Sequence, residues 1–247
     1  MTTSTAILLP RREQALPAPG VEGRSNRLVT SGYAADGEAA AALFFWSHTR
    51  FFSDFAFGLH PHEGFEIVSV ILEGRTGHYD TVTDRWYDLN AGDAQIIRSG
   101  AGLRHRERAY AGARVFQIWI DPGFATALHR KPSYTDHPAA SLPVYQTGDA
   151  LVTDLIGGEG PMESFTEGLI MRRAVVPAGA HADLGVGSDR FSLAYLIDGV
   201  ASLNGAPTQS DDAISFNGAT SLAIDAKDRA DVFIVSLPAH PSYQLVR

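Results

Sequence analysis

Short apolar runs alternate along most of the chain with turns rich in Gly, Asp, Asn and Pro. Such runs, bounded by turn-forming residues, are typical of β-strands, and evenly spaced short strands favour a sandwich or barrel. Helix is expected only in short pieces such as Phe124–Arg130, while Leu151–Ile156 fits either element. The predicted strands are Ala42–Trp46, Phe65–Leu72, Trp86–Leu89, Ala94–Arg98, Arg114–Ile120, Leu169–Val176, Phe191–Ile197, Ala213–Phe216, Ser221–Ile224 and Asp231–Leu237.

A weak internal repeat divides the chain into two strand-rich blocks. FEIVSVILEG (65–74) and GDAQII (92–97) in the first block correspond to FSLAYLIDG (191–199) and DDAISF (211–216) in the second. In each block an apolar strand ends in an acidic residue plus Gly, and a later Asp-Ala opens another strand. The segment 130–143, rich in Pro, Ser and Ala, is interpreted as a linker or long surface connection. This pattern predicts two copies of one barrel unit.

The composition narrows the classes of function. The 247 residues are 45% hydrophobic and 19% charged, as expected for a soluble globular protein, and the net charge of −8 opposes direct binding to nucleic acid or anionic membranes. The apolar run near the N-terminus is too short for a signal peptide, and no membrane-spanning run follows, so a cytoplasmic location is expected. Without cysteine, the strong metal ligands left are His, Asp and Glu.

The stretch HPHEGFE (60–66) contains a candidate half of a metal site. On a strand, residues two apart point to the same face, so His60 and His62 project together. Pro61 disfavours the helical conformation at His60 and keeps the pair extended. Alone, such a pair is most often a surface or capping pair.

The second half lies in RHRER, residues 104–108. On a strand, His105 and Glu107 share one face, and Arg104, Arg106 and Arg108 share the other. Burying three arginines without partners is costly, so the arginines are expected to face outward. Three imidazoles and one carboxylate suit a divalent transition metal: Fe(II), Mn, Co, Ni, Cu or Zn.

HPHEGFEIVSVILEG (60–74), NAGDAQIIRSGAGLRHRE (90–107) and VFQIWIDP (115–122) resemble the pirin family of the cupin superfamily. The resemblance implies an all-β bicupin: two stacked antiparallel β-barrels of jelly-roll type with few short helices. The expected division is a flexible arm (1–24), a metal-binding barrel (25–130) and a degenerate barrel with the linker (131–247).

The resemblance also implies one metal, most often iron, held by His60, His62, His105 and Glu107. The second barrel keeps only His181 near a ligand position, so no second site is expected there. The chain departs from the family pattern at Glu63 and at the three arginines, which changes the rim and outer face rather than the ligands.

Three further polar residues are candidates for the surroundings of the metal or the pocket. Glu66 is expected near the site or in solvent, and Glu63 at the cavity mouth or exposed. Gln117 is expected either in hydrogen-bonding reach of bound water or a ligand histidine, or as a hydrogen-bonded glutamine of the core. The remaining histidines are expected at the surface, and the phenylalanines near the first half-site line either the core or a cavity: His48, His78, His129, His137 and His240; Phe51, Phe52, Phe55, Phe57 and Phe65.

Two functions follow as hypotheses. The resemblance implies a flavonol (quercetin) 2,3-dioxygenase-type enzyme that takes a small aromatic or enolic substrate and O₂, with Glu107 as general base. The alternative is a non-enzymatic iron- or redox-sensing regulator that binds a protein partner through the arginine face formed by Arg104, Arg106 and Arg108.

Overall fold

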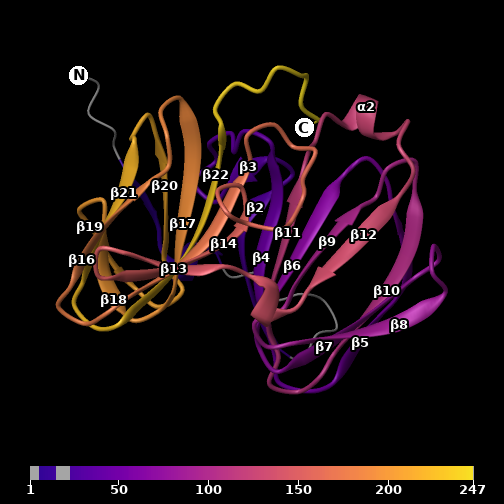
Figure 1. The fold of residues 1–247 in the computed structure, drawn as a ribbon, viewed down its shortest axis with the longest axis horizontal. Helices are drawn as coiled ribbons and strands as arrows, with labels where there is room; N and C mark the ends of the chain where they lie inside the picture. The colour runs from indigo at the N-terminus through magenta and orange to yellow at the C-terminus, as the bar shows by residue number, and fades with distance from the viewer. Residues whose placement is uncertain (1–5, 15–22, 247) are drawn as a thin grey trace.

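The protein folds into two pairs of antiparallel β-sheets (Figure 1). The structure is a computed structural model that describes residues 6–14 and 23–246. Each pair combines a seven-stranded sheet with a four-stranded sheet. The predicted all-β bicupin architecture is confirmed. Among the described residues the helical elements are short: α1 (Arg11–Gln14), α2 (Phe124–Ala127) and a 3₁₀ turn, Ala139–Ser141.

The N-terminal pair holds the candidate ligands. Its seven-stranded sheet has the order β12 (Ser133–His137), β9 (Ala94–Arg98), β6 (Glu66–Glu73), β11 (Arg114–Ile120), β4 (Leu43–Phe51), β2 (Gly23–Thr30) and β3 (Tyr33–Ala34). Its four-stranded sheet has the order β5 (Phe55–His62), β10 (Leu103–Ala109), β7 (Arg75–Asp80) and β8 (Arg85–Asn90).

The C-terminal pair repeats this layout. Its larger sheet has the order β1 (Ile7–Leu9), β20 (Ala213–Asn217), β17 (Arg190–Asp198), β22 (Ala230–Pro238), β15 (Ile170–Val176), β14 (Ala150–Ile156) and β13 (Val144–Thr147). Its smaller sheet has the order β16 (His181–Gly185), β21 (Ser221–Ala226), β18 (Val200–Leu203) and β19 (Ala206–Gln209). The run predicted as either strand or helix is therefore strand β14.

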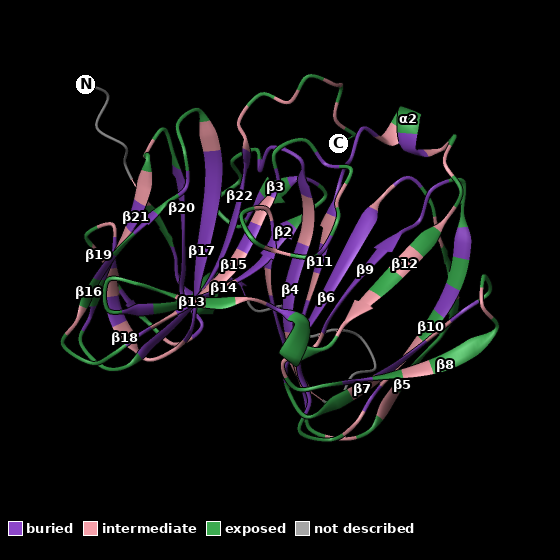
Figure 2. Cartoon of the chain, viewed as in Figure 1, coloured by how far each residue is buried: buried purple, intermediate pink, exposed green. Residues whose placement is uncertain are grey.

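The two larger sheets pack against each other through a continuous apolar core. Trp46 of β4 is fully buried, and its ring centroid lies 5.5 Å from Phe116, 6.2 Å from Tyr195 and 5.8 Å from Phe233. One apolar cluster contains residues of both sheet pairs, and the central strands are buried along their length (Figure 2). Aromatic packing of this kind fixes the relative position of the two pairs.

The interiors of the two pairs differ in polarity. The C-terminal interior is filled by one apolar cluster that includes Leu184, Leu222 and Ile224. The apolar clusters inside the N-terminal pair are small, for example Ile67, Ile97 and Leu103. Polar side chains and a cavity occupy the space between these clusters, so the N-terminal interior offers room for chemistry.

Two short strands qualify the expected domain limits. β12 lies within the segment interpreted as a linker, yet it pairs with β9 of the N-terminal sheet. β1, from the expected N-terminal arm, pairs with β20 of the C-terminal sheet; residues 1–5 and 15–22 of that arm lie outside the described residues. We therefore propose that the two units divide after β12. Within the described chain, no helix is long and apolar enough to cross a membrane.

Candidate metal centre

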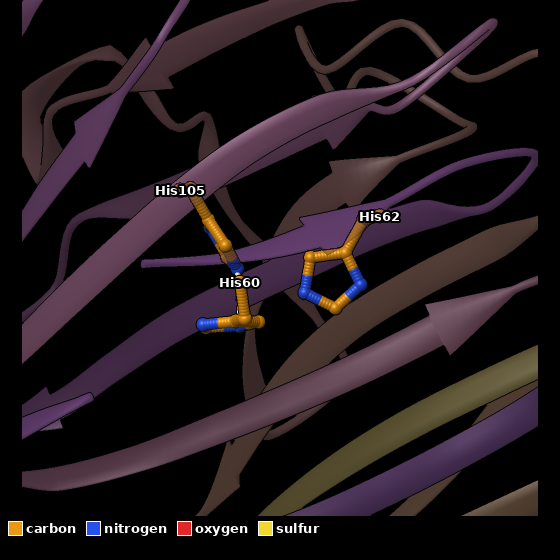
Figure 3. A group of neighbouring side chains, drawn as sticks. All are labelled: His60, His62 and His105. Atoms are coloured by element: carbon orange, nitrogen blue, oxygen red, sulfur yellow. Dashed lines mark hydrogen bonds between the residues drawn. The ribbon is translucent and has the colours of Figure 1, made fainter. Parts of the chain in front are cut away.

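Three imidazoles meet on the inner face of the four-stranded sheet. β10 runs antiparallel to β5 and places His105 directly opposite His60. His62 lies on the same face of β5, as the two-residue spacing predicts. The ring centroids lie 4.4 Å apart for His60 and His105, 4.6 Å for His62 and His105, and 4.8 Å for His60 and His62 (Figure 3). One ligand nitrogen from each can face a common ion.

The hydrogen bond of His60 to the backbone directs its Nε2 lone pair toward the other imidazoles. His60 Nδ1 lies 2.7 Å from the Gly58 carbonyl oxygen, so it donates its proton there and leaves Nε2 unprotonated in the neutral ring. His60 Nε2 and His105 Nε2 are only 2.9 Å apart. A donor bond from one ring nitrogen to a backbone carbonyl commonly orients a metal-ligating histidine. The imidazole group therefore fits a bound transition metal.

Burial keeps two of these rings neutral. Burial, reinforced by the neighbouring imidazoles, lowers the pKa of His62 to about 3 and that of His105 to about 3. Imidazole must be neutral to bind a metal ion. Near neutral pH both residues therefore present a lone pair rather than a positive charge.

Acid is expected to weaken the metal-free fold through His62. The unfolded chain takes up this proton near pH 6.5 and the folded chain only near pH 3, so between these values the unfolded state binds more protons. The free energy of unfolding therefore falls as the pH drops from 6.5 toward 3, and this residue has no such effect above 6.5. Urea denaturation at pH 7 and pH 4.5 should show a smaller acid loss in His62→Gln than in the wild type; equal losses would contradict the argument.

Glu107 lies beside the three imidazoles but in a second, overlapping group. The pairing of β10 with β5 shifts between His105 and Glu107, so Glu107 lies opposite Phe57 on β5 and His78 on β7. Ligand atoms of His78, His105 and Glu107 lie within 4.8 Å of one another. The four predicted ligands thus form two groups that share His105. To join His60 and His62, the Glu107 carboxylate would have to move closer to them.

Gln117 of β11 connects the opposite sheet to this carboxylate. Its Nε2 donates to both Glu107 oxygens at 3.1 Å, and Trp119 Nε1 donates to its Oε1 at 3.3 Å. The sequence placed Gln117 within reach of bound water or a ligand histidine, whereas its partner is Glu107. Held in this way by Trp119, the amide fixes the position of the carboxylate.

His78 was expected at the surface, and this prediction was wrong. Its side chain is 2% exposed, and neither ring nitrogen has a hydrogen-bond partner among the described residues. Its ring centroid lies 5.3 Å from that of His105. Spacing along one strand does not reveal this position, because the partner of His78 lies across the strand pair. His78-x-Asp80 repeats the two-residue spacing of the other two motifs, which is the signal that could have revealed it.

His48 was also expected at the surface and is buried instead. It lies on the face of β4 opposite the cavity, between the two sheet pairs, and its Nδ1 is 2.7 Å from the Tyr195 hydroxyl. The reason is again alternation: Ser47 and Thr49 face the cavity, so His48 must face the other barrel. His129 and His240 are exposed as expected, and His137 is half-buried.

Glu66 was expected near the metal or in solvent, and the structure excludes the position in solvent. It is buried and accepts hydrogen bonds from the Ser164 hydroxyl at 2.6 Å, the Phe165 N–H at 2.8 Å and the Thr166 hydroxyl at 2.7 Å. Glu66 therefore anchors a loop of the C-terminal half to the N-terminal sheet. Glu63 is exposed and borders a surface depression that also contains His62.

The arginine face points outward, as the alternation predicts. Arg104 and Arg106 are exposed and Arg108 is half-buried, whereas His105 is fully buried. The Arg106 guanidinium carbon lies 4.3 Å from the Tyr79 ring centroid, and that of Arg108 lies 4.4 Å from Trp86. Stacking on aromatic rings holds these cations on the outer surface of the four-stranded sheet.

A cavity of about 140 Å³ lies between the two sheets beside Glu107. Gln117 and His78 line it on the metal side. Three phenylalanines contribute apolar walls: Phe45, Phe51 and Phe57. Of the five phenylalanines weighed between core and cavity, two therefore line the cavity, while Phe52 is exposed. A bound metal at this place would adjoin a space with both polar and apolar walls.

The paired sheets have the cupin fold, and the histidine group is a candidate metal centre in the N-terminal half. The pirin family model matches residues 38–120, which contain all four predicted ligands. Among similar chains is a pirin-like protein of Caulobacter vibrioides, 26% identical over 78% of this chain and 82% of its own length. These similarities confirm the predicted resemblance to the pirin family.

Two further comparisons extend this result. The quercetin 2,3-dioxygenase of Escherichia coli K12 is 24% identical over 74% of this chain and 76% of its own length. The bacterial pirin YhhW of Escherichia coli, solved in complex with nickel(II), has the same fold, with a TM-score of 0.79 and 19% identity over 96% of this chain and all of that one. This likeness in structure concerns the fold alone.

Proposed function

We propose that the protein is a metal-dependent dioxygenase of the quercetin 2,3-dioxygenase type, which opens a hydroxylated aromatic or enolic ring with O₂. The observation that carries this proposal is the group of three imidazoles beside a carboxylate that faces a cavity. The names of the relatives support the same class of reaction. Both atoms of O₂ enter the products, so no other oxidant or reductant is required.

His60, His62 and His105 would hold the ion, and Glu107 is the proposed fourth ligand. The resemblance favours iron(II), although this donor set also accepts Mn, Ni, Co, Cu or Zn. When bound, the ion supplies Lewis acidity toward the substrate hydroxyl and a binding position for O₂. The cavity between the sheets limits the access of water to the reacting atoms.

Glu107 is the proposed general base. Its carboxylate lines the cavity, where it can accept the proton of a substrate hydroxyl. The two contacts from Gln117 hold it toward the interior rather than toward solvent. A carboxylate fixed in this way meets the requirement that a base be positioned before the substrate arrives.

Glu107→Gln is expected to lower kcat for a flavonol by about 10²-fold or more, because an amide cannot accept the proton. The measurement is O₂ uptake together with bleaching of the flavonol absorbance, with the Fe, Mn, Ni, Co and Cu forms of the wild type and the variant compared at equal metal content. A surface substitution, Glu63→Gln, is the control and should leave turnover unchanged.

If no metal form of the wild type consumes O₂ with a flavonol or a smaller phenol, the dioxygenase proposal fails. The alternative of a metal-binding regulator would then gain weight. The feature that favours this alternative is the outer face where Arg106 stacks beside the exposed Trp86.

A further inference from the structure

The cavity beside Glu107 is small compared with a flavonol. Its volume is about 140 Å³. An apolar cavity of about 150 Å³ is known to accommodate one benzene ring. A flavonol has three rings, so most of such a molecule would have to remain outside this space. The volume favours a substrate with a single ring.

Arg27 extends into this cavity from β2. It pairs in register with Ser47 of β4, and both residues line the cavity. Its Nε is buried without a hydrogen-bond partner, and no acidic group among the described residues forms an ion pair with it. The neighbouring arginines on the same two strands, Arg24 and Arg50, point to the opposite side and contact Asp211.

A half-buried guanidinium without an anion is unfavourable in the empty protein. The nearest aromatic contact, with Phe45, is at 6.0 Å and does not satisfy its N–H donors. An incoming carboxylate would supply the missing acceptor in a bidentate geometry. Arg27 is therefore suited to bind an anionic group of a ligand.

The charges around the cavity agree with this reading. Besides Arg27, the charged or titratable residues that border it are Glu107, His78 and Arg108, and the Arg108 guanidinium lies over Trp86 on the outer face. Glu107 is engaged by Gln117, and Arg108 pairs with Asp88 at 2.9 Å. A divalent ion at the imidazole triad would add positive charge that Glu107 offsets only in part. The interior of the loaded protein then attracts anions.

Resting on the proposed dioxygenase function, we propose that the substrate is a hydroxylated single-ring carboxylate. Its carboxylate pairs with Arg27, and its ring lies against the aromatic wall formed by Phe45, Phe51 and Phe57. Its hydroxyl faces Glu107, which accepts the proton. Ser47 and Ser69 add hydroxyl groups to the lining and can donate to the carboxylate.

The test measures binding separately from turnover. Salicylate (2-hydroxybenzoate), phenol and quercetin are titrated calorimetrically into metal-loaded protein under nitrogen, and again into metal-free protein. Arg27→Gln is expected to weaken salicylate binding roughly tenfold to a hundredfold, as for the loss of a charged hydrogen bond, in both forms. Phenol, which lacks the carboxylate, should bind the variant and the wild type equally.

Arg85→Gln, on the exposed strand β8, is the matched control and should change nothing. Arg27→Lys keeps the positive charge but loses the planar guanidinium group, so an intermediate loss of salicylate affinity is expected. The same variant replaces Arg27→Gln in the test if Arg27→Gln does not fold stably. Unchanged salicylate affinity in Arg27→Gln, or tighter binding of quercetin than of salicylate to the wild type, overturns the proposal. Salicylate binding that depends on Arg27 without any O₂ uptake would uphold the binding site and refute the dioxygenase function instead.

Discussion

His105→Ala is expected to abolish metal binding. His105 is fully buried, lies opposite His60 and belongs to both groups of candidate ligands, so its loss removes a donor from each. The variant keeps two imidazoles and the Glu107 carboxylate, and this weaker donor set is expected to lose a divalent ion on dialysis. Elemental analysis of the purified, dialysed variant should show a fall from about one metal ion per chain to nearly none.

His181→Ala provides the control for this experiment. His181 is an exposed histidine on β16 whose Nδ1 lies 2.8 Å from an Asp225 oxygen, and its variant should keep the full metal content. His60→Ala is the second test variant, because His60 is less buried and its removal leaves a smaller void in the interior. Full metal content in a folded His105→Ala or His60→Ala protein would refute the site assignment.

The strand faces of this site were predictable from sequence because side-chain direction in a strand has a period of two. That period alone predicts that His60 and His62 share one face of their strand. It also predicts that His105 points to the face opposite the three arginines. The same rule applied to RTGHYD would have placed His78 beside Asp80 on the inner face. The two-residue period therefore contains enough information to predict that His78 points inward.

Other features depend on pairing register, which no single strand encodes. The shift between His105 and Glu107 in the pairing with β5 places Glu107 opposite Phe57, while its regular pairing with β7 places it opposite His78. A register shift arises where two strands meet, and its position depends on the packing of both sheets. The sequence therefore predicts which residues share a face, but not that Glu107 lies in a separate group.

The contacts between the two sheet pairs were the least predictable part of the fold. Glu66 follows the metal motif closely in sequence, yet it binds backbone and hydroxyl groups about a hundred residues further along the chain. Such a partner lies on a loop whose position is set by the docking of the two halves. Proximity in sequence to a metal motif is consequently weak evidence for a role in the site.

The most strongly charged of these contacts centres on Asp211, in the turn before β20. Its side chain is 2% exposed, accepts a hydrogen bond from the Tyr195 hydroxyl at 2.9 Å and lies 3.1 Å from Arg50 and 3.4 Å from Arg24. Burial by itself raises the pKa of Asp211, but the His48 hydrogen bond and the charge of Arg50, among other contacts, lower it overall. The carboxylate is therefore held in its charged form.

Asp211→Asn is expected to lower the free energy of unfolding by about 2 kcal/mol. Removing one partner of a fully buried ion pair costs about 3–5 kcal/mol, and the partial exposure of Arg24 and Arg50 reduces that figure. Asn tolerates the positive φ of 73° at this position, so the loss reports on charge rather than on backbone strain. Urea denaturation at pH 7 measures this loss of stability. The control is Asp189→Asn, at an exposed aspartate with φ 53°, which should change the free energy of unfolding little.

The stability difference between wild type and Asp211→Asn should also depend on pH. Because the pKa of Asp211 is lowered in the folded protein, its carboxylate stabilises the fold above pH 3.8, the ordinary pKa, and the difference should narrow as the pH falls below that value. A difference that stays constant with pH, or a loss no larger than in Asp189→Asn, would show that this carboxylate does not hold the two halves together electrostatically.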